Sequence, residues 1–278
     1  MKLNKKEISD YVQNFLKEDR SNEDITSKYF INNKQKARAL FLAEENIVLS
    51  GNNIVLYIFK KCCKNFKLIS KLEDGKKIKK KTKILVLEGN ARDILSIERT
   101  TLNLLQHLSG ISTLTSKFSN KINSSKTILL DTRKTTPGLR TLEKYATYIG
   151  GAKNHRLNLA ERFMIKDNHM FLNSKIFEKI RKMKTNKKNT VIMECDNLYQ
   201  VKKAIFLKIK HILLDNMDIK KIKEASKLIG KSAKIEVSGG INLQNIEKIS
   251  NIGVNFISVG AITQSAPAAK ISLELEKI

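Results

Sequence analysis

The sequence is poor in proline, cysteine and tryptophan, with two Pro, three Cys and no Trp in 278 residues. Cys62, Cys63 and Cys195 form an odd set without CxxC spacing, which argues against a disulfide framework or a zinc site. No apolar run approaches the roughly 18 residues of a membrane-spanning helix. No apolar segment follows the charged N-terminal residues, as it would in a secretory signal. These absences predict a cytoplasmic protein with no membrane partner.

Acidic residues are also scarce, with 27 Asp and Glu against 53 Lys and Arg, and the formal net charge is +26. Such a charge is typical of nucleic-acid-binding proteins. Most of the basic residues are nevertheless Lys spread along the whole chain, with one dense run at 76–83, and stacking aromatic residues are few. We therefore expect no nucleic-acid partner. The alternative from a different class of function is a basic RNA- or DNA-binding protein. Nucleic-acid binding whose affinity falls steeply with salt, without any enzymatic turnover, would support this alternative.

Arginine is used sparingly and unevenly. Nine of the 53 basic residues are Arg, and five of these lie between 99 and 162: Arg99, Arg133, Arg140, Arg156 and Arg162. Where Lys is used almost everywhere, a retained Arg marks a position that needs a planar, bidentate donor. Carboxylates and phosphates are the groups that such a donor binds.

The hydrophobic pattern changes at about residue 127. Before it, the pattern is mixed α/β: helices at 5–17 and 53–61, strands at 37–43, 64–70 and 83–87, a helix at 91–107, an interruption at Ser109-Gly110 and a second helix to 121. After it, short apolar runs at 127–130, 163–165, 191–193, 212–214, 235–237 and 256–259 alternate with amphipathic segments at 199–207, 219–229 and 243–249. This alternation predicts a parallel sheet, and six or seven such units favour a closed or nearly closed β/α barrel.

Polar motifs follow every one of these apolar runs. They are Asp131, the segment 166–169, Glu194, Asp215-Asn216, Ser238-Gly239-Gly240 and Gly260. Barrel enzymes place their active sites at the C-terminal ends of the strands. The pattern therefore predicts an enzyme.

The glycine and carboxylate motifs each predict a binding function. Ser238-Gly239-Gly240, with Gly260 at the next strand end, is typical of a phosphate site, because glycine lets the backbone approach an anion closely. Glu194 and Asp215 end neighbouring strands and suit either Mg²⁺ or the hydroxyl groups of a ribose. Asp196 is expected to cap the helix that follows it.

Positive side chains gather in three segments near these motifs. Arg133 and Lys134 lie in the loop 131–138, and the segments 154–156 and 166–169 add further donors. His107 and His211 are expected to be structural, and no arrangement typical of covalent catalysis is present in the sequence. The residues therefore predict a polyanionic small molecule that meets a phosphorylated sugar.

The motifs also occur in a familiar order. They are Asp24-Ile25-Thr26-Ser27, Glu98-Arg99-Thr100, Leu108-Ser109-Gly110-Ile111, the segment 131–138, Lys144-Tyr145-Ala146, Gly150-Gly151, Asn154-His155-Arg156, Lys166-Asp167-Asn168-His169, Glu194, Leu214-Asp215-Asn216 and Ser238-Gly239-Gly240. Together they resemble the quinolinate phosphoribosyltransferase family, whose members are also called carboxylating nicotinate-nucleotide pyrophosphorylases. The resemblance extends over nearly the whole chain.

The resemblance implies an α/β fold with two domains. Residues 1–108 would form an N-terminal α/β sandwich, residues 109–264 an incomplete TIM-like β/α barrel of about seven parallel strands, and residues 265–278 would pack back on the sandwich. It also implies a homodimer with shared active sites, and a hexamer is left open.

The resemblance further implies a role for each site residue. Quinolinate would be bound by Arg99, donated across the dimer, and by Arg133, His155, Arg156 and Lys166. Phosphoribosyl pyrophosphate would be bound by Lys134, Glu194, Asp215, Ser238, Gly239, Gly240 and Gly260. Lys134, Glu194 and Asp215 would serve catalysis, and Glu194 and Asp215 would hold the cofactor Mg²⁺, directly or through water.

The implied activity is a step of NAD biosynthesis. A type II quinolinate phosphoribosyltransferase converts quinolinate and phosphoribosyl pyrophosphate into nicotinate mononucleotide, CO₂ and pyrophosphate. The nearest alternatives share the sugar-phosphate site: a molybdenum-associated pyrophosphorylase-like protein and a nicotinate phosphoribosyltransferase. Five cationic candidates exceed the need of a monocarboxylate, which favours quinolinate.

Overall fold

A computed structural model describes Met1 and residues 3–278. The chain divides into two compact units. Unit 1 consists of Met1–Ser116, Thr141–Gly151 and Ser265–Ile278, and unit 2 consists of Lys117–Arg140 and Ala152–Gln264.

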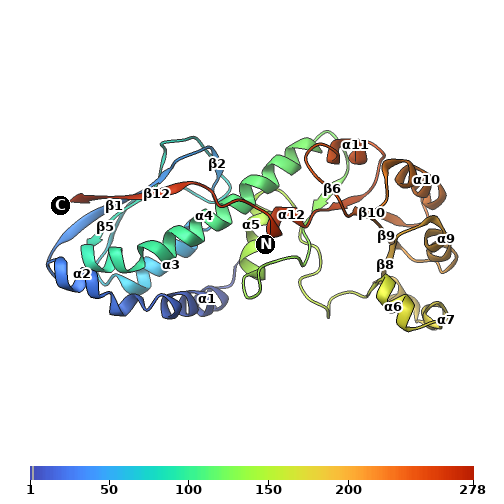
Figure 1. The fold of residues 1–278 in the computed structure, drawn as a ribbon, viewed down its shortest axis with the longest axis horizontal. Helices are drawn as coiled ribbons and strands as arrows, with labels where there is room; N and C mark the ends of the chain where they lie inside the picture. The colour runs from blue at the N-terminus through green and yellow to red at the C-terminus, as the bar shows by residue number, and fades with distance from the viewer. Residues whose placement is uncertain (2) are drawn as a thin grey trace. The chain divides into compact units, whose positions relative to one another are not determined.

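Unit 1 is built on an antiparallel sheet with the strand order β12-β1-β5-β3. Its strands are β1 (Lys36–Ala43), β3 (Lys67–Lys71), β5 (Lys83–Asn90) and β12 (Ile271–Lys277), and a second small sheet pairs β2 (Ile47–Val48) with β4 (Lys77–Ile78). The C-terminal strand β12 runs beside β1, although more than 220 residues separate them along the chain (Figure 1). The dense lysine run at 76–83 extends from just before β4 to the first residue of β5, and all of its Lys side chains are exposed.

Helices complete unit 1. They are α1 (Lys5–Glu18), the 3-10 helix η1 (Ser21–Glu23), α2 (Ile25–Phe30), α3 (Asn52–Cys62), α4 (Ala91–Lys121), whose last turn belongs to unit 2, and α5 (Arg140–Ile149), whose first residue belongs to unit 2. Asn4 and Glu7 form a capping box that begins α1. The core of the unit is apolar, with Phe41 and Phe59 fully buried in edge-to-face contact.

The predicted interruption at Ser109-Gly110 is wrong, because α4 is continuous through both residues. The two residues serve close packing instead. Ser109 donates a hydrogen bond to the Ser50 carbonyl and accepts one from the Ser50 N–H, each at 3.1 Å. A Cβ atom on Gly110 would lie 2.0 Å from the carbonyl oxygen of Pro267. Glycine is therefore present because another backbone segment crosses the helix there.

We expect Gly110→Ala to destabilise the protein. Alanine favours a helix over glycine by about 1 kcal/mol, but here the added methyl group would displace the Pro267 backbone, at a cost of about 1–3 kcal/mol beyond that gain. Urea denaturation measures the difference. Asn120→Ala, at an exposed position of the same helix, is the control and should be neutral or slightly stabilising. A Gly110→Ala protein as stable as the wild type would contradict the packing explanation.

Unit 2 contains a six-stranded, fully parallel sheet with the order β6-β11-β10-β9-β8-β7. The strands are β6 (Ile128–Leu130), β7 (Met164–Ile165), β8 (Ile192–Cys195), β9 (His211–Asp215), β10 (Lys234–Ser238) and β11 (Phe256–Ser258). Each coincides with a predicted run to within one or two residues, so the barrel-like α/β fold is confirmed. Six strands occur among the described residues where about seven were expected, and a single parallel bridge joins Leu130 of β6 to Lys153.

Helices connect the strands of unit 2. They are α6 (Asp167–Leu172), α7 (Ile176–Lys182), α8 (Thr185–Lys188), α9 (Leu198–Phe206), α10 (Ile219–Ile229), α11 (Ile246–Ser250) and α12 (Ala261–Gln264). Figure 1 shows α9 and α10 beside the strands that they connect. In the part of the chain that the structure describes, no helix is long and apolar enough to cross a membrane.

Candidate active site

Every predicted site residue except Arg99 belongs to unit 2 and lies at or near a strand end. Arg133 and Lys134 follow β6, Lys166 follows β7, and Glu194 is the penultimate residue of β8. Asp215 and Ser238 end β9 and β10, Gly239 and Gly240 follow β10, and Gly260 follows β11. His155 and Arg156 lie in the loop before β7. Because the strands are parallel neighbours, their carboxyl ends meet at one edge of the sheet.

Two adjacent glycines after β10 have conformations and surroundings that suit close approach of a ligand. Gly239 has φ +85°, and a Cβ atom there would lie 2.1 Å from Asn216 Oδ1 and 2.7 Å from the Asn216 backbone nitrogen. Gly240 has φ +63°, and its Cβ position has no atom within 4 Å, so this side of the turn is open. The turn can therefore present backbone to an anion on its open side.

Lys134 lies beside the third glycine. A Cβ atom on Gly260 would lie 2.8 Å from Lys134 Cδ. The Lys134 backbone is fixed at both polar groups: its N–H donates to Thr132 Oγ1 at 3.0 Å, and its carbonyl accepts from Thr263 Oγ1 at 2.7 Å. The side chain is exposed, so its ammonium group can reach a ligand at the glycine-bearing strand ends.

Lys166 and Glu194 form an ion pair, with 2.5 Å between Lys166 Nζ and Glu194 Oε2. Burial raises the pKa of the Glu194 carboxyl, the hydrogen bond and charge of Lys166 lower it, and the charges of Asp215 and Asp196 raise it again; the net shift is upward. The carboxylates of β8 and β9 are thus close enough to repel one another. A cation bound between them would relieve this repulsion.

The prediction that Asp196 caps α9 is wrong. Asn197 is the N-cap, and its side chain accepts from Gln200 N–H at 3.0 Å. The pKa of Asp196 is raised by burial first and by the charges of Asp215 and Asp167 next. Asp196 therefore adds a third carboxylate to the negative charge around Asp215.

Arg133 and Arg156 lie close enough for their positive charges to interact. The pKa of Arg156 is lowered, first by burial and then by the charge of Arg133, against the opposing effect of Glu161 and Glu194. The Nε of Arg133 is buried and has no hydrogen-bond partner among the described residues. Two guanidinium groups that repel each other, one with an unpaired buried donor, are chemically suited to bind an anion.

The loop 154–156 is fixed by Asp131, which is fully buried directly after β6. Asp131 Oδ2 accepts from the Asn154 side chain at 2.6 Å, and Oδ1 accepts from the His155 backbone N–H at 2.8 Å. The side chain of Arg156 donates to the Arg162 carbonyl at 3.0 Å. Asp131 thus holds the loop that carries two of the predicted quinolinate residues.

Arg99 is the one predicted site residue outside unit 2. It lies on α4 within unit 1, and its side chain is exposed. Its contribution to a site stays a prediction.

Comparisons with protein-family models match both parts of the chain. Residues 24–109 match the N-terminal domain of quinolinate phosphoribosyl transferase, and residues 111–274 match its C-terminal domain. The chain belongs to the quinolinate phosphoribosyltransferase family.

Relatives of known name agree with the family models. A decarboxylating quinolinate phosphoribosyltransferase of Nicotiana glauca is 33% identical over 291 residues, which cover 97% of this chain and 82% of the relative. The crystal structure of a nicotinate-nucleotide pyrophosphorylase from Ehrlichia chaffeensis has a TM-score of 0.92 and 35% identity, with 99% of this chain and 100% of that chain covered. A human nicotinic acid phosphoribosyltransferase is similar in fold alone, with a TM-score of 0.62 and 11% identity over 94% of this chain and 73% of that chain.

Sequence reasoning missed one buried residue of this phosphoribosyltransferase, Glu236. It lies inside the apolar run of β10 and is fully buried, and its carboxylate contacts His155 and His211. The sequence did contain a signal for it, because a carboxylate is almost never buried without partners. A glutamate within an apolar strand that is buried on both faces therefore indicates that polar partners lie nearby. His211, expected to be structural, is one of these partners; His107 bonds instead to the buried Glu143 at 2.9 Å.

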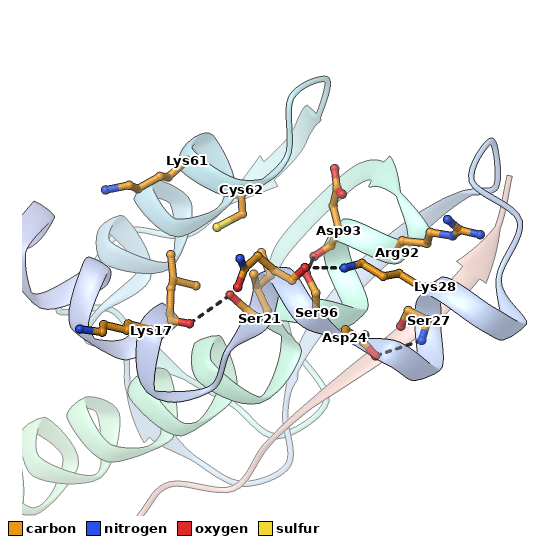
Figure 2. A pocket seen from close by; sticks show the side chains of 13 residues that line it. Lys17, Ser21, Asp24, Ser27, Lys28, Lys61, Cys62, Arg92, Asp93 and Ser96 are labelled. Carbon is orange, nitrogen blue, oxygen red and sulfur yellow. Dashed lines mark hydrogen bonds between the residues drawn. The ribbon is translucent and has the colours of Figure 1, made fainter.

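A cavity of about 640 Å³ lies elsewhere in the phosphoribosyltransferase, between α1, α2, α3 and α4 of unit 1 (Figure 2). None of the predicted site residues lines it. Several of its polar groups are already bonded within the protein: Lys28 Nζ donates to the Asn22 carbonyl, and Arg92 Nε donates to the Ile31 carbonyl, each at 2.6 Å. Its charges are mixed, and it gives no chemical argument for a ligand.

Proposed function

We propose that this protein transfers the phosphoribosyl group of phosphoribosyl pyrophosphate to the ring nitrogen of quinolinate, forming nicotinate mononucleotide, CO₂ and pyrophosphate. The observation that carries this proposal is the pair of guanidinium groups, Arg133 and Arg156, at the same strand ends as the Gly239-Gly240 turn. A dicarboxylate and a sugar phosphate require such a combination. Family membership supports the same reaction.

The residues divide into two groups in this proposal. Arg133, Arg156 and Lys166, with His155 beside them and Arg99 from a partner subunit, surround quinolinate. Lys134, Glu194, Asp215, Ser238, Gly239, Gly240 and Gly260 surround phosphoribosyl pyrophosphate. The ion pair of Lys166 with Glu194 connects the two groups and would place the two substrates side by side.

The carboxylates suit Mg²⁺ that arrives with the diphosphate. No group of three or more His, Cys, Asp or Glu side chains within the described residues could hold a metal ion by itself. Mg²⁺ is commonly held by one or two carboxylates together with substrate phosphates and water. Glu194 and Asp215, whose charges repel each other, would hold it in this way. When bound, the ion neutralises charge on the pyrophosphate.

The chain's own groups position the reactants. Lys134 would neutralise the departing pyrophosphate, so that the bond from ribose C1 to oxygen breaks while the quinolinate nitrogen bonds to C1. The positive ring nitrogen then lets the 2-carboxylate leave as CO₂, and the electron pair left on the ring takes up a proton. Arg133 and Arg156 would hold quinolinate in the orientation that this attack requires. No covalent bond to the protein is needed.

A homodimer with a shared site is part of this proposal. Helix α2 exposes Ile25, Tyr29 and Phe30 at 81, 83 and 75 %, and unit 2 exposes Leu159, Phe171 and Leu172. Apolar side chains exposed in this way are typical of interfaces. Arg99, exposed on α4, would enter the site of the partner. A cytoplasmic location and the absence of a nucleic-acid partner remain predictions from composition.

The reaction is tested by incubating the protein with quinolinate, phosphoribosyl pyrophosphate and Mg²⁺ and measuring nicotinate mononucleotide by chromatography. Nicotinate lacks the 2-carboxylate, so one guanidinium group would be left unpaired and kcat/KM should fall by about 100-fold or more. Quinolinate labelled in its 2-carboxylate should release labelled CO₂ in the same amount as the nicotinate mononucleotide that is formed. Equal kcat/KM for the two acids would favour a nicotinate phosphoribosyltransferase instead.

A further inference from the structure

Glu236 lies at the centre of unit 2 and is bonded by side chains from three other segments. Its Oε2 is 2.7 Å from His211 Nε2 on β9, and its Oε1 is 3.4 Å from His155 Nε2. Ser258 on β11 also donates to Oε1. The Glu236 side chain has no exposed surface, and those of His155 and His211 are 8 and 6 % exposed.

These contacts keep Glu236 ionised in spite of its burial. Burial raises the pKa of the carboxyl, but the hydrogen bonds from His155 and His211 outweigh this effect, and the net shift of the pKa is downward. A buried carboxylate is costly, and apolar side chains of similar volume commonly serve a core as well or better. Stability alone therefore gives no reason for a glutamate here.

The ring of His155 is fixed in one tautomer. The backbone N–H of Arg156 donates to His155 Nδ1 at 2.8 Å, so Nδ1 carries a lone pair and no proton. The ring proton is then on Nε2, which faces Glu236. In this arrangement both ring nitrogens of His155 have partners inside the protein.

The contact connects the two halves of the site. His155 bonds the backbone of Arg156, which belongs to the quinolinate side. Glu236 lies two residues before Ser238, the residue that precedes the Gly239-Gly240 turn. Ser258 lies two residues before Gly260. One buried carboxylate thus joins the loop of Arg156 to both strands that end in the phosphate site.

We propose that Glu236 is a positioning residue which, through the Nε2–H tautomer of His155, sets the place of Arg156 against quinolinate. His155 then acts by orienting the loop that carries Arg156. This inference rests on the proposed function for its kinetic consequence, but its structural part, the tautomer, is independent of the reaction.

The kinetic test is Glu236→Gln. Glutamine keeps the shape, but its amide NH₂ must face one of three donors, so the His155 contact is weakened or the ring changes tautomer. We expect the KM for quinolinate to rise about tenfold, as for one lost hydrogen bond to a charged group, and the KM for phosphoribosyl pyrophosphate to rise by clearly less. In a His155→Gln background the same substitution should add no further change.

Glu143→Gln is the matched control. Glu143 is also fully buried and bonded to a histidine, His107, but it lies in unit 1 outside the proposed machinery. The Glu143→Gln substitution should lower the denaturation temperature and leave the KM for quinolinate within about twofold of the wild-type value. A Glu236→Gln protein that is folded with an unchanged quinolinate KM would overturn the proposal, and so would equal changes in both KM values.

The tautomer is tested on the wild-type protein without substrates, so the reaction itself does not affect the result. Two-dimensional ¹⁵N NMR of the imidazole groups at pH 8, with the His155 signals assigned by their loss in His155→Gln, should show a protonated Nε2 and an unprotonated Nδ1. A protonated Nδ1 would overturn the proposal. Failure to form nicotinate mononucleotide would overturn the proposed function and leave the tautomer result standing.

Discussion

Asp215→Asn is expected to reduce kcat roughly 100-fold and to raise the Mg²⁺ concentration needed for half-maximal rate, because in the proposed function the Asp215 charge would hold Mg²⁺ and pyrophosphate. Asp215 ends β9 and acts on Glu194 through its charge. Binding of quinolinate alone, measured by calorimetry, should stay within about twofold of wild type, because no described contact joins Asp215 to the Arg133 and Arg156 pair.

Asp218→Asn is the control for Asp215→Asn. Asp218 caps α10 three residues later, and asparagine caps a helix about as well as aspartate, so the same charge is lost without a structural cost. Its activity should match wild type. Glu194→Gln should behave differently from Asp215→Asn, because it also removes the partner of Lys166 and should change quinolinate binding. Loss of quinolinate binding in Asp215→Asn with normal Mg²⁺ dependence would contradict the assigned roles.

Mixtures of inactive Arg99→Ala and inactive Lys166→Ala subunits are expected to regain activity. Arg99 belongs to unit 1 and Lys166 to unit 2, and in a shared-site dimer each site would take one residue from each chain. A mixed dimer then has one site with both lesions and one with neither. At equal amounts about half of the dimers are mixed, so roughly a quarter of wild-type activity should return.

Subunit exchange must be measured separately, for example by co-purification of differently tagged subunits. Mixing Lys166→Ala with Arg133→Ala is the control: both residues belong to unit 2, so every site of a mixed dimer carries one lesion and no activity should return. Exchange without recovery in the Arg99 mixture would mean that Arg99 does not act across a dimer.

The sequence predicted those elements whose pattern is local. Helix α10 begins and ends at the predicted residues, because its apolar side chains repeat at helical spacing and Asp218 caps it. The strands of unit 2 were found because each is a short apolar run between turn signals. The glycine turn after β10 was also predictable, since its conformation requires glycine at Gly239.

Features that depend on distant contacts were not predictable in the same way. Gly110 has the sequence signal of a helix break, and only the crossing of Pro267 explains why a glycine lies within a continuous helix. Asp196 and Asn197 are both good helix caps, and their side-chain contacts decide between them. The pairing of Glu236 with His155 joins residues 81 positions apart, and no periodic pattern reveals it.

The position of β12 in the sheet also determines the order in which the protein can form during synthesis. Strand β1 lies between β5 and β12, so one edge of β1 has no neighbour until residues 271–277 have left the ribosome. At ordinary rates of translation this takes on the order of ten seconds or more. All strands of unit 2 emerge before that time, and its sheet can close first. During this interval the edge of β1 is an open template for pairing with other nascent chains, and a chaperone that covers it would have its greatest effect there.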